Sequence, residues 1–111
     1  MEHCKPMDQT PWDTVSRLVD WLDSESQLPP DMVRILRVLK ISEENGEAAE
    51  AVHGVMGSNP RKGTSHTWED VQREVCDVIL TGMVALKTLS PDAEKVFNEH
   101  LSSVADRSLS G

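Results

Sequence analysis

Residues 68–89 read WEDVQREVCDVILTGMVALKTL, and this segment constrains the fold more than any other part of the chain. From Val75 to Leu89 apolar residues lie on almost every side of a helix, so we expect this helix to be buried on most sides. Thr67 and Asp70 form a box-like cap at its start. The chain has no Tyr and one Phe, and no segment alternates apolar and polar residues as a strand does. The sequence therefore predicts an all-α fold.

Two shorter helices are expected towards the two ends of the chain. The first begins at Thr10, which can cap backbone amides, with Pro11 at the first helical position, and it ends before the prolines at 29–30. The last begins with the Ser-Pro-Asp sequence at 90–92. Their apolar stripes comprise Trp12, Val15, Leu18, Val19 and Leu22 in the first helix, and Ala93, Val96, Phe97, Leu101 and Val104 in the last.

A long helix is expected over residues 31–56, and its burial pattern changes sides halfway along. The residues expected to be buried in its first half are Met32, Ile35, Leu36 and Leu39. Beyond residue 40 that same face carries Glu43, Glu47 and Glu50, while the opposite face carries Ile41, Ala48, Val52 and Val55. Residues 57–66 are dense in turn formers and predict a loop.

Length and charge limit the classes of protein to consider. With 111 residues the chain fits one compact domain, expected over residues 10–107 between tails at 1–9 and 108–111. The net charge of -8 has the wrong sign for binding nucleic acid or anionic lipid. No stretch approaches the ~18 apolar residues needed to cross a bilayer. The N-terminus lacks the basic start and apolar run of a signal peptide, so we expect a cytoplasmic protein.

Acidic residues on the apolar helix are the first indication of chemistry. Asp70, Glu74 and Asp77, with Thr81 one turn further on, form one narrow polar strip on this helix. Ionised groups in a core cost several kcal/mol unless a cation or hydrogen-bond donors neutralise them. No basic residue on the strip does this for Asp77. A bound metal ion would resolve the conflict.

A second acidic pair lies on the long helix. Glu44 and Glu47 are three residues apart and can reach a common point, and Glu74 and Asp77 repeat this spacing. Two helices that each present such a pair can close a cage of oxygen ligands when they pack side by side. Ligation by oxygen alone suits Mg²⁺ or Mn²⁺, and Mg²⁺ commonly binds a substrate's phosphates together with protein carboxylates. The pattern therefore indicates a phosphate ester or anhydride substrate.

These residues also carry a resemblance to a known family. The sequence Glu-Glu-Asn-Gly-Glu at 43–47, followed after 26 residues by Glu-Val-Cys-Asp at 74–77, resembles the EExxE and ExxD signature of the all-α MazG-like nucleoside triphosphate pyrophosphohydrolases. Residues 31–90 are similar to that family in character. The resemblance implies a four-helix MazG-like bundle completed by oligomerisation, and a house-cleaning hydrolase that cleaves a (d)NTP to the monophosphate and pyrophosphate.

The resemblance also implies roles for individual residues. The Mg²⁺ ligands, with Mn²⁺ as a possible substitute, would be Glu44, Glu47, Glu74 and Asp77. Glu47 or Glu43 would accept the proton of the attacking water. Cations are needed to bind a triphosphate in so acidic a site. The candidates are Arg61 and Lys62 in the loop, then Lys40 and Lys87, with Lys95, His100 and Arg107 on the last helix as weaker ones.

Base recognition and assembly are the remaining expectations. Trp21 lies off the main stripe of the first helix, so its ring is the candidate for stacking on a nucleobase. The two central helices have apolar residues on more than one face, which exceeds what two short helices can cover. We therefore expect a homodimer or homotetramer, in which a neighbouring chain contributes to the pocket.

Two other functional classes fit parts of the pattern. A di-iron or di-manganese carboxylate bundle would use Glu-x-x-His pairs, and neither acidic pair here contributes a His. A non-catalytic helical module that keeps the fold to bind a metal or a basic partner is the alternative to the enzyme. Retention of all four acids argues against that alternative, although fold analogy alone does not choose between the two.

Overall fold

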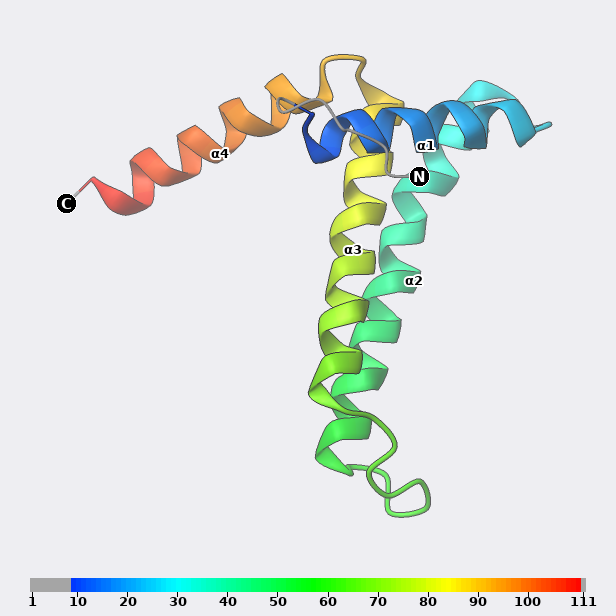
Figure 1. Cartoon of the computed structure of the whole chain (residues 1–111), viewed down its shortest axis with the longest axis vertical. Coiled ribbons are helices and arrows are strands. Elements are labelled where there is room, and N and C mark those ends of the chain that lie inside the picture. The colour runs from blue at the N-terminus through cyan, green and yellow to red at the C-terminus, as the bar shows by residue number, and fades with distance from the viewer. Residues whose placement is uncertain (1–8, 111) are drawn as a thin grey trace, which may run out of the picture.

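The computed structural model describes residues 9–110, and all regular secondary structure in this range is helical (Figure 1). The helices are α1 (Pro11–Glu25), α2 (Pro30–Met56), α3 (Trp68–Leu89) and α4 (Ala93–Leu109). The predicted all-α class with four helices is confirmed. The tail predicted at 1–9 lies almost wholly outside the described residues. The tail predicted at 108–111 is shorter than expected, because α4 continues through Leu109.

The cap predicted at α3 forms in full, and the one predicted at α1 forms in part. At α1 the Thr10 amide donates a hydrogen bond to the Asp13 carboxylate over 2.9 Å, but the Thr10 hydroxyl, expected to cap backbone amides, has no partner among the described residues. At α3 the Thr67 amide donates to Asp70 over 2.9 Å, and the Asp70 amide donates back to the Thr67 hydroxyl over 3.2 Å. These bonds satisfy backbone groups that have no partner within the helix. They fix where α3, which carries Glu74 and Asp77, begins.

The helices α2 and α3 form a long antiparallel hairpin, and α1 crosses its open end (Figure 1). Val15 and Val19 of α1 are buried, and Trp12, Leu18 and Leu22 are half-buried. The apolar stripe predicted for α1 is therefore confirmed. Its contacts are made chiefly with α3.

The face of α2 that packs on α3 differs from the predicted one. Met32, Ile35, Leu36 and Leu39 were expected inside, but each is 46 to 59 % exposed. The inward stripe advances three or four residues at a time along the whole helix and comprises Val33, Arg37, Ile41, Glu44, Ala48, Ala51 and Val55. This stripe contains an arginine and a glutamate, so a search for apolar residues selects the wrong side. The predicted change of sides is wrong for the same reason. Beyond residue 40 the prediction agrees with the structure for Ile41, Ala48 and Val55, which belong to the inward stripe, but not for Val52, which is exposed.

The single chain is extended. Its radius of gyration is 17.5 Å, whereas about 13 Å is typical of a compact domain of this length. Helix α4 leaves the hairpin and projects away from it (Figure 1). On α3, Val75, Ile79 and Leu80 are exposed, so the expected burial of this helix on most sides is not reached within one chain. The single domain expected over residues 10–107 stays a prediction.

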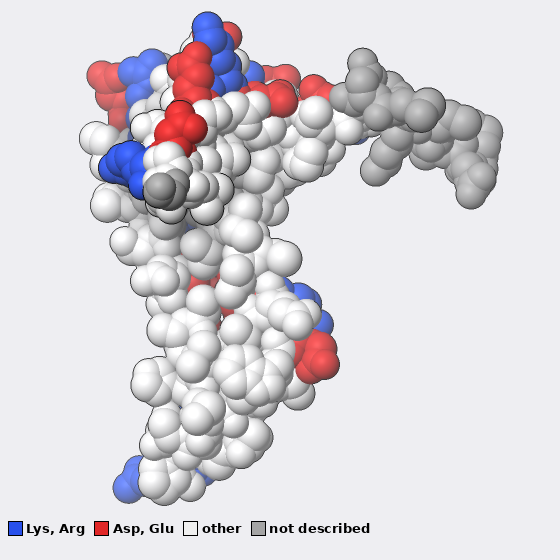
Figure 2. Space-filling view, turned by 90° about the vertical axis from the view of Figure 1, so that its left-hand side faces the viewer, with Lys and Arg blue, Asp and Glu red and all other residues white. Residues whose placement is uncertain are grey.

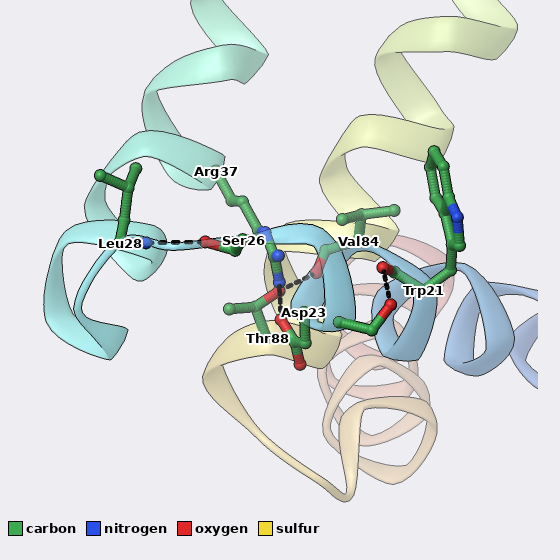
Figure 3. Close-up of polar contacts among 8 residues, drawn as sticks. Trp21, Asp23, Ser26, Leu28, Arg37, Val84 and Thr88 are labelled. Carbon is green, nitrogen blue, oxygen red and sulfur yellow. Dashed lines mark hydrogen bonds and ion pairs between the residues drawn. The ribbon is translucent and has the colours of Figure 1, made fainter.

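A polar junction holds the first three helices together at the open end of the hairpin (Figure 3). The Arg37 guanidinium, whose side chain is only 12 % exposed, pairs with Asp23 of α1 at 2.8 Å and donates to the Thr88 hydroxyl of α3 at 3.0 Å. The Thr88 hydroxyl in turn donates to the Val84 carbonyl over 2.7 Å. Arg37 therefore has partners on both neighbouring helices, as a largely buried charge requires.

Candidate metal centre

Three carboxylates from two helices converge midway along the hairpin. Glu44 of α2 and Glu74 and Asp77 of α3 each offer one oxygen, and these oxygens lie within 4.8 Å of one another. We call these three residues the acidic cluster. Figure 2 shows acidic atoms at mid-height of the hairpin, recessed behind uncharged side chains. Of the four ligands expected from the sequence, the structure brings these three together.

The local sequence explains this convergence. Glu44 belongs to the inward stripe of α2, and Glu74 belongs to the matching stripe of α3, which continues through Val78 and Thr81. Both glutamates therefore point into the seam between the helices. Asp77 is three residues beyond Glu74, on the same side but exposed. The cluster is closed on the side of the seam and open to solvent at Asp77.

One oxygen of the cluster has no partner. Glu74 Oε2 is buried and accepts no hydrogen bond from any described residue. A buried carboxylate oxygen without a donor or a cation is costly, and most such atoms in folded proteins are satisfied. Three carboxylates, one of which carries the unsatisfied oxygen, are of the ligand type that a hard divalent cation such as Mg²⁺ or Mn²⁺ takes. The residues present therefore fit the metal that the sequence suggested.

The electrostatics of Glu44 indicate crowded negative charge. Partial burial raises the pKa of Glu44 above its ordinary value of 4.5. A hydrogen bond shared with the Glu47 carboxyl and the negative charges of Glu47 and Asp77 raise this pKa further, while Lys40 lowers it. The Lys40 ammonium lies 3.9 Å from a Glu44 oxygen, and its side chain is 56 % exposed. One exposed lysine screens the cluster only weakly.

The other predicted acids lie beside the cluster. Glu47 lies near enough to Glu44 to raise the pKa of that carboxyl, but its oxygens are not among the three that converge. Glu43 is exposed on the outer side of α2. Asp70, which belongs to the predicted acidic strip, caps α3 and pairs with Arg73 instead. The strip thus divides into Asp70, which has partners, and the pair Glu74 and Asp77, which meets Glu44.

The predicted phosphate-binding cations are dispersed. Lys40 is at the cluster. Lys87 donates to the Pro91 carbonyl over 2.7 Å, and it follows Asp77 by ten residues, about 15 Å along the helix. Arg61 and Lys62 lie in the loop that joins α2 to α3. The structure therefore brings Lys40 to the acids and leaves Lys87 remote from them.

The loop after α2 folds back against the outer side of that helix and encloses a cavity of about 530 Å³. Lys62 lines this cavity. The other lining residues include Gly46 and Glu50, which lie before and after Glu47 on α2, and the histidines His53 and His66. Arg61 is not part of its lining. The cavity thus connects one predicted cation with the turn of α2 that carries the acids.

Sequence reasoning missed the two histidines of this cavity. His53 Nδ1 bonds the Ser58 hydroxyl over 2.9 Å, and His66 Nδ1 bonds the Ser65 hydroxyl over 2.8 Å. Gly54 lets the His66 ring lie against α2, because a Cβ there would come within 2.0 Å of His66 Nδ1. A glycine within a helix can indicate that another segment packs closely against it, and Gly54 is the signal in the sequence that could have predicted this contact.

Trp12 and Trp21 of α1 have different surroundings. The Trp12 ring packs near Phe97, with centroids 6.1 Å apart, so it has a structural contact with α4. The Trp21 ring is 58 % exposed. In Figure 3 this ring points from α1 in the direction in which α2 and α3 extend. Stacking of Trp21 on a nucleobase stays a prediction.

Comparison of the chain with protein-family models, with curated proteins and with solved structures finds no match. No described helix is long and apolar enough to cross a membrane. The function is therefore argued from the residues of this chain.

Proposed function

We propose that this chain is a Mg²⁺-dependent nucleoside triphosphate pyrophosphohydrolase, with Mn²⁺ as a possible substitute, that cleaves a (d)NTP to the monophosphate and pyrophosphate. The observation that carries the proposal is the convergence of Glu44, Glu74 and Asp77, in which the buried Glu74 Oε2 has no partner among the described residues. The order and spacing of the acids at 43–47 and 74–77, which resemble the MazG-like signature, add to it.

The chain's own residues divide the work of this reaction. Glu44, Glu74 and Asp77 would hold the metal ion, with Glu47 as a further ligand from the next turn. When bound, the ion offsets charge on the triphosphate and lowers the pKa of a water. A carboxylate oxygen of Glu47 or Glu43 would accept the proton of the attacking water. No covalent protein nucleophile takes part.

The substrate would reach the acidic cluster from the side that is open to solvent at Asp77. Lys40 at the cluster would meet its phosphate oxygens, and Lys62 of the loop is the further cation proposed for them. Trp21 would stack on the base from the open end of the hairpin. Arg61, which is exposed in the same loop, would act only after a movement of that loop.

The proposal includes assembly into a homodimer or homotetramer with a MazG-like bundle at its centre. Val75, Ile79 and Leu80 are exposed on α3, and Figure 2 shows a hairpin face with few charged atoms below α4. Exposed apolar patches of this kind are typical of interfaces. Packing of two hairpins would bury this face and shield the acidic cluster from bulk water.

The test is pyrophosphate release from a panel of NTPs and dNTPs with Mg²⁺, Mn²⁺ or EDTA. We expect release that requires the metal and is lost in Asp77→Asn and Glu47→Gln. Glu69→Gln is the matched control, because Glu69 is exposed on the first turn of α3, away from the cluster. A folded protein that binds Mn²⁺ but releases no pyrophosphate from any nucleotide would contradict the enzyme and favour a non-catalytic metal-binding module.

A further inference from the structure

Helix α4 has too little support within its own chain. Ala93 is buried against α3, but Val96, Phe97 and Leu101 on the following turns are exposed. The helix runs for 17 residues, about 25 Å, and projects from the hairpin (Figure 1). An isolated helix of this length is marginal in water, because most helix stability in proteins comes from tertiary packing. The apolar side of α4 therefore requires a covering surface.

A surface of matching size is exposed on α2. Met32, Ile35, Leu36 and Leu39 lie at helical spacing on the side turned away from α3, and all four are exposed. We call these four residues the outer stripe. The outer stripe extends for about 10 Å along α2. The apolar side of α4, measured from Val96 to Leu101 and including part of the next turn, has a similar length. Both surfaces lie at the same end of the hairpin, because α2 begins where α4 leaves (Figure 1).

The exposed area of the chain indicates what covers these surfaces. The chain exposes 8697 Å², whereas a folded monomer of this mass exposes about 6,100 Å². The excess of about 2,600 Å² far exceeds the ~800 Å² per partner of a standard interface and matches an obligate homo-oligomer. A second copy of the chain supplies both missing surfaces at once.

Charged residues flank both surfaces. Arg34 and Lys40, both more than half exposed, flank the outer stripe of α2, and each pairs with an acidic residue of its own helix. On α4, Glu94, Lys95 and Glu99 are exposed, and Lys95 pairs with Glu99. A polar rim around an apolar contact is typical of protein interfaces. The length of α4 is also enough to cross a neighbouring helix, since packed helices lie 8–10 Å apart.

We infer that the apolar side of α4, formed by Val96, Phe97 and Leu101, packs on the outer stripe of α2 in a second copy, and that the exchange is reciprocal. A two-fold axis along the hairpin brings both contacts to the same end of the dimer. The inference concerns assembly and holds whether or not the chain hydrolyses nucleotides.

Sedimentation of the full chain, with helix content followed by circular dichroism, tests the contact. We expect a dimer or larger species, and an increase of about tenfold or more in its dissociation constant for Leu101→Asp and for Leu36→Asp. The double variant should be no weaker than the single ones, because both changes break one contact. Ser102→Asp, on the side of α4 opposite Val96, Phe97 and Leu101, is the control and should leave the constant unchanged. A monomeric wild type, or a dimer that Leu101→Asp does not weaken, would overturn the inference.

Crosslinking answers the case in which the aspartate variants fail to fold. In a Cys4→Ser, Cys76→Ser background, chains with Leu101→Cys are mixed with chains carrying Leu36→Cys and treated with a short bifunctional maleimide. A crosslinked heterodimer is expected, and replacing Leu101→Cys by Ser102→Cys, on the opposite face of α4, should abolish it. Equal crosslinking with either cysteine would refute the assigned face of α4. Pyrophosphate release measured on the same samples separates this outcome from failure of the proposed function.

Discussion

Arg37 and Glu44 occupy the same inward stripe of α2, two turns apart, yet their surroundings are opposite. Arg37 has a carboxylate from α1 and a hydroxyl from α3 within 3.0 Å. Glu44 meets two further carboxylates and one exposed lysine, and the neighbouring Glu74 Oε2 has no partner. A polar residue in a helix seam is structural when the chain supplies its partners. Where the chain supplies mostly like charge, as at Glu44, the proposed metal ion would supply the missing partner.

The largest expected effect is at the acidic cluster. Asp77→Asn should lower pyrophosphate release by about 100-fold or more, because it removes a charged ligand from the metal site. Mg²⁺ should raise the melting temperature of the wild type but not of this variant. Differential scanning fluorimetry with and without Mg²⁺ checks the second point. Equal stabilisation of both proteins by Mg²⁺ would remove Asp77 from the site.

The next effect concerns the polar junction and should have the opposite signature. Arg37→Ala should lower the free energy of unfolding by about 1–2 kcal/mol, because Thr88 and Asp23 lose a charged partner and Asp23 remains partly hydrated. Mn²⁺ affinity of the folded variant should be unchanged. Urea unfolding and calorimetry measure the two quantities, with the exposed Arg17→Ala as control. If Arg37→Ala lost as much Mn²⁺ affinity as Asp77→Asn does, the polar junction and the acidic cluster would not have separate roles.

A smaller effect of unusual sign is expected for Glu74→Gln. Without metal this variant should melt about 2–5 °C higher than the wild type, because it removes one of three crowded charges and its amide can donate to Glu44 or Asp77. It should also lose the stabilisation by Mg²⁺. Thermal unfolding in EDTA, with Glu69→Gln beside it, makes the measurement. A lower melting temperature in EDTA would mean that the buried charge is already compensated within the chain.

The smallest effect is the pH dependence of the α3 cap. The hydrogen bond from the Thr67 amide, aided by Arg73, lowers the pKa of Asp70 below its ordinary value of 3.8. Asp70 therefore contributes stability above that value, and the contribution is lost as the pH falls through the lowered pKa. Unfolding of the wild type and of Asp70→Asn between about pH 6 and pH 2 should show curves that converge in acid. Parallel curves would show that the charge of Asp70 adds nothing.

Much of the fold could be predicted from local pattern. The cap at Thr67, the Asp13 half of the cap at Thr10 and the stripe of α1 depend on residues close in sequence, and the structure has them. The inward face of α2 could not be predicted from apolar residues, because Arg37 and Glu44 belong to it. The apolar residues on its other side follow the pattern of a core face, but they are exposed in the single chain.

The candidate site could be predicted in part. The spacing of Glu44, Glu74 and Asp77 gave the converging acids, since three-residue spacing fixes a common side of each helix. The loop cavity with His53 and His66 could not be foreseen, because it depends on how residues 57–67 fold back on α2. The direction of α4 likewise depends on a short turn, which carries no periodic signal.

The most direct test of the central claim is a calorimetric titration of Mn²⁺ into the metal-free wild type, Glu74→Gln and Glu69→Gln. We predict saturable binding to the wild type and to Glu69→Gln, and binding at least about tenfold weaker in Glu74→Gln. Equal Mn²⁺ affinity in all three proteins, or no binding to the wild type, would show that the acidic cluster is not a metal centre.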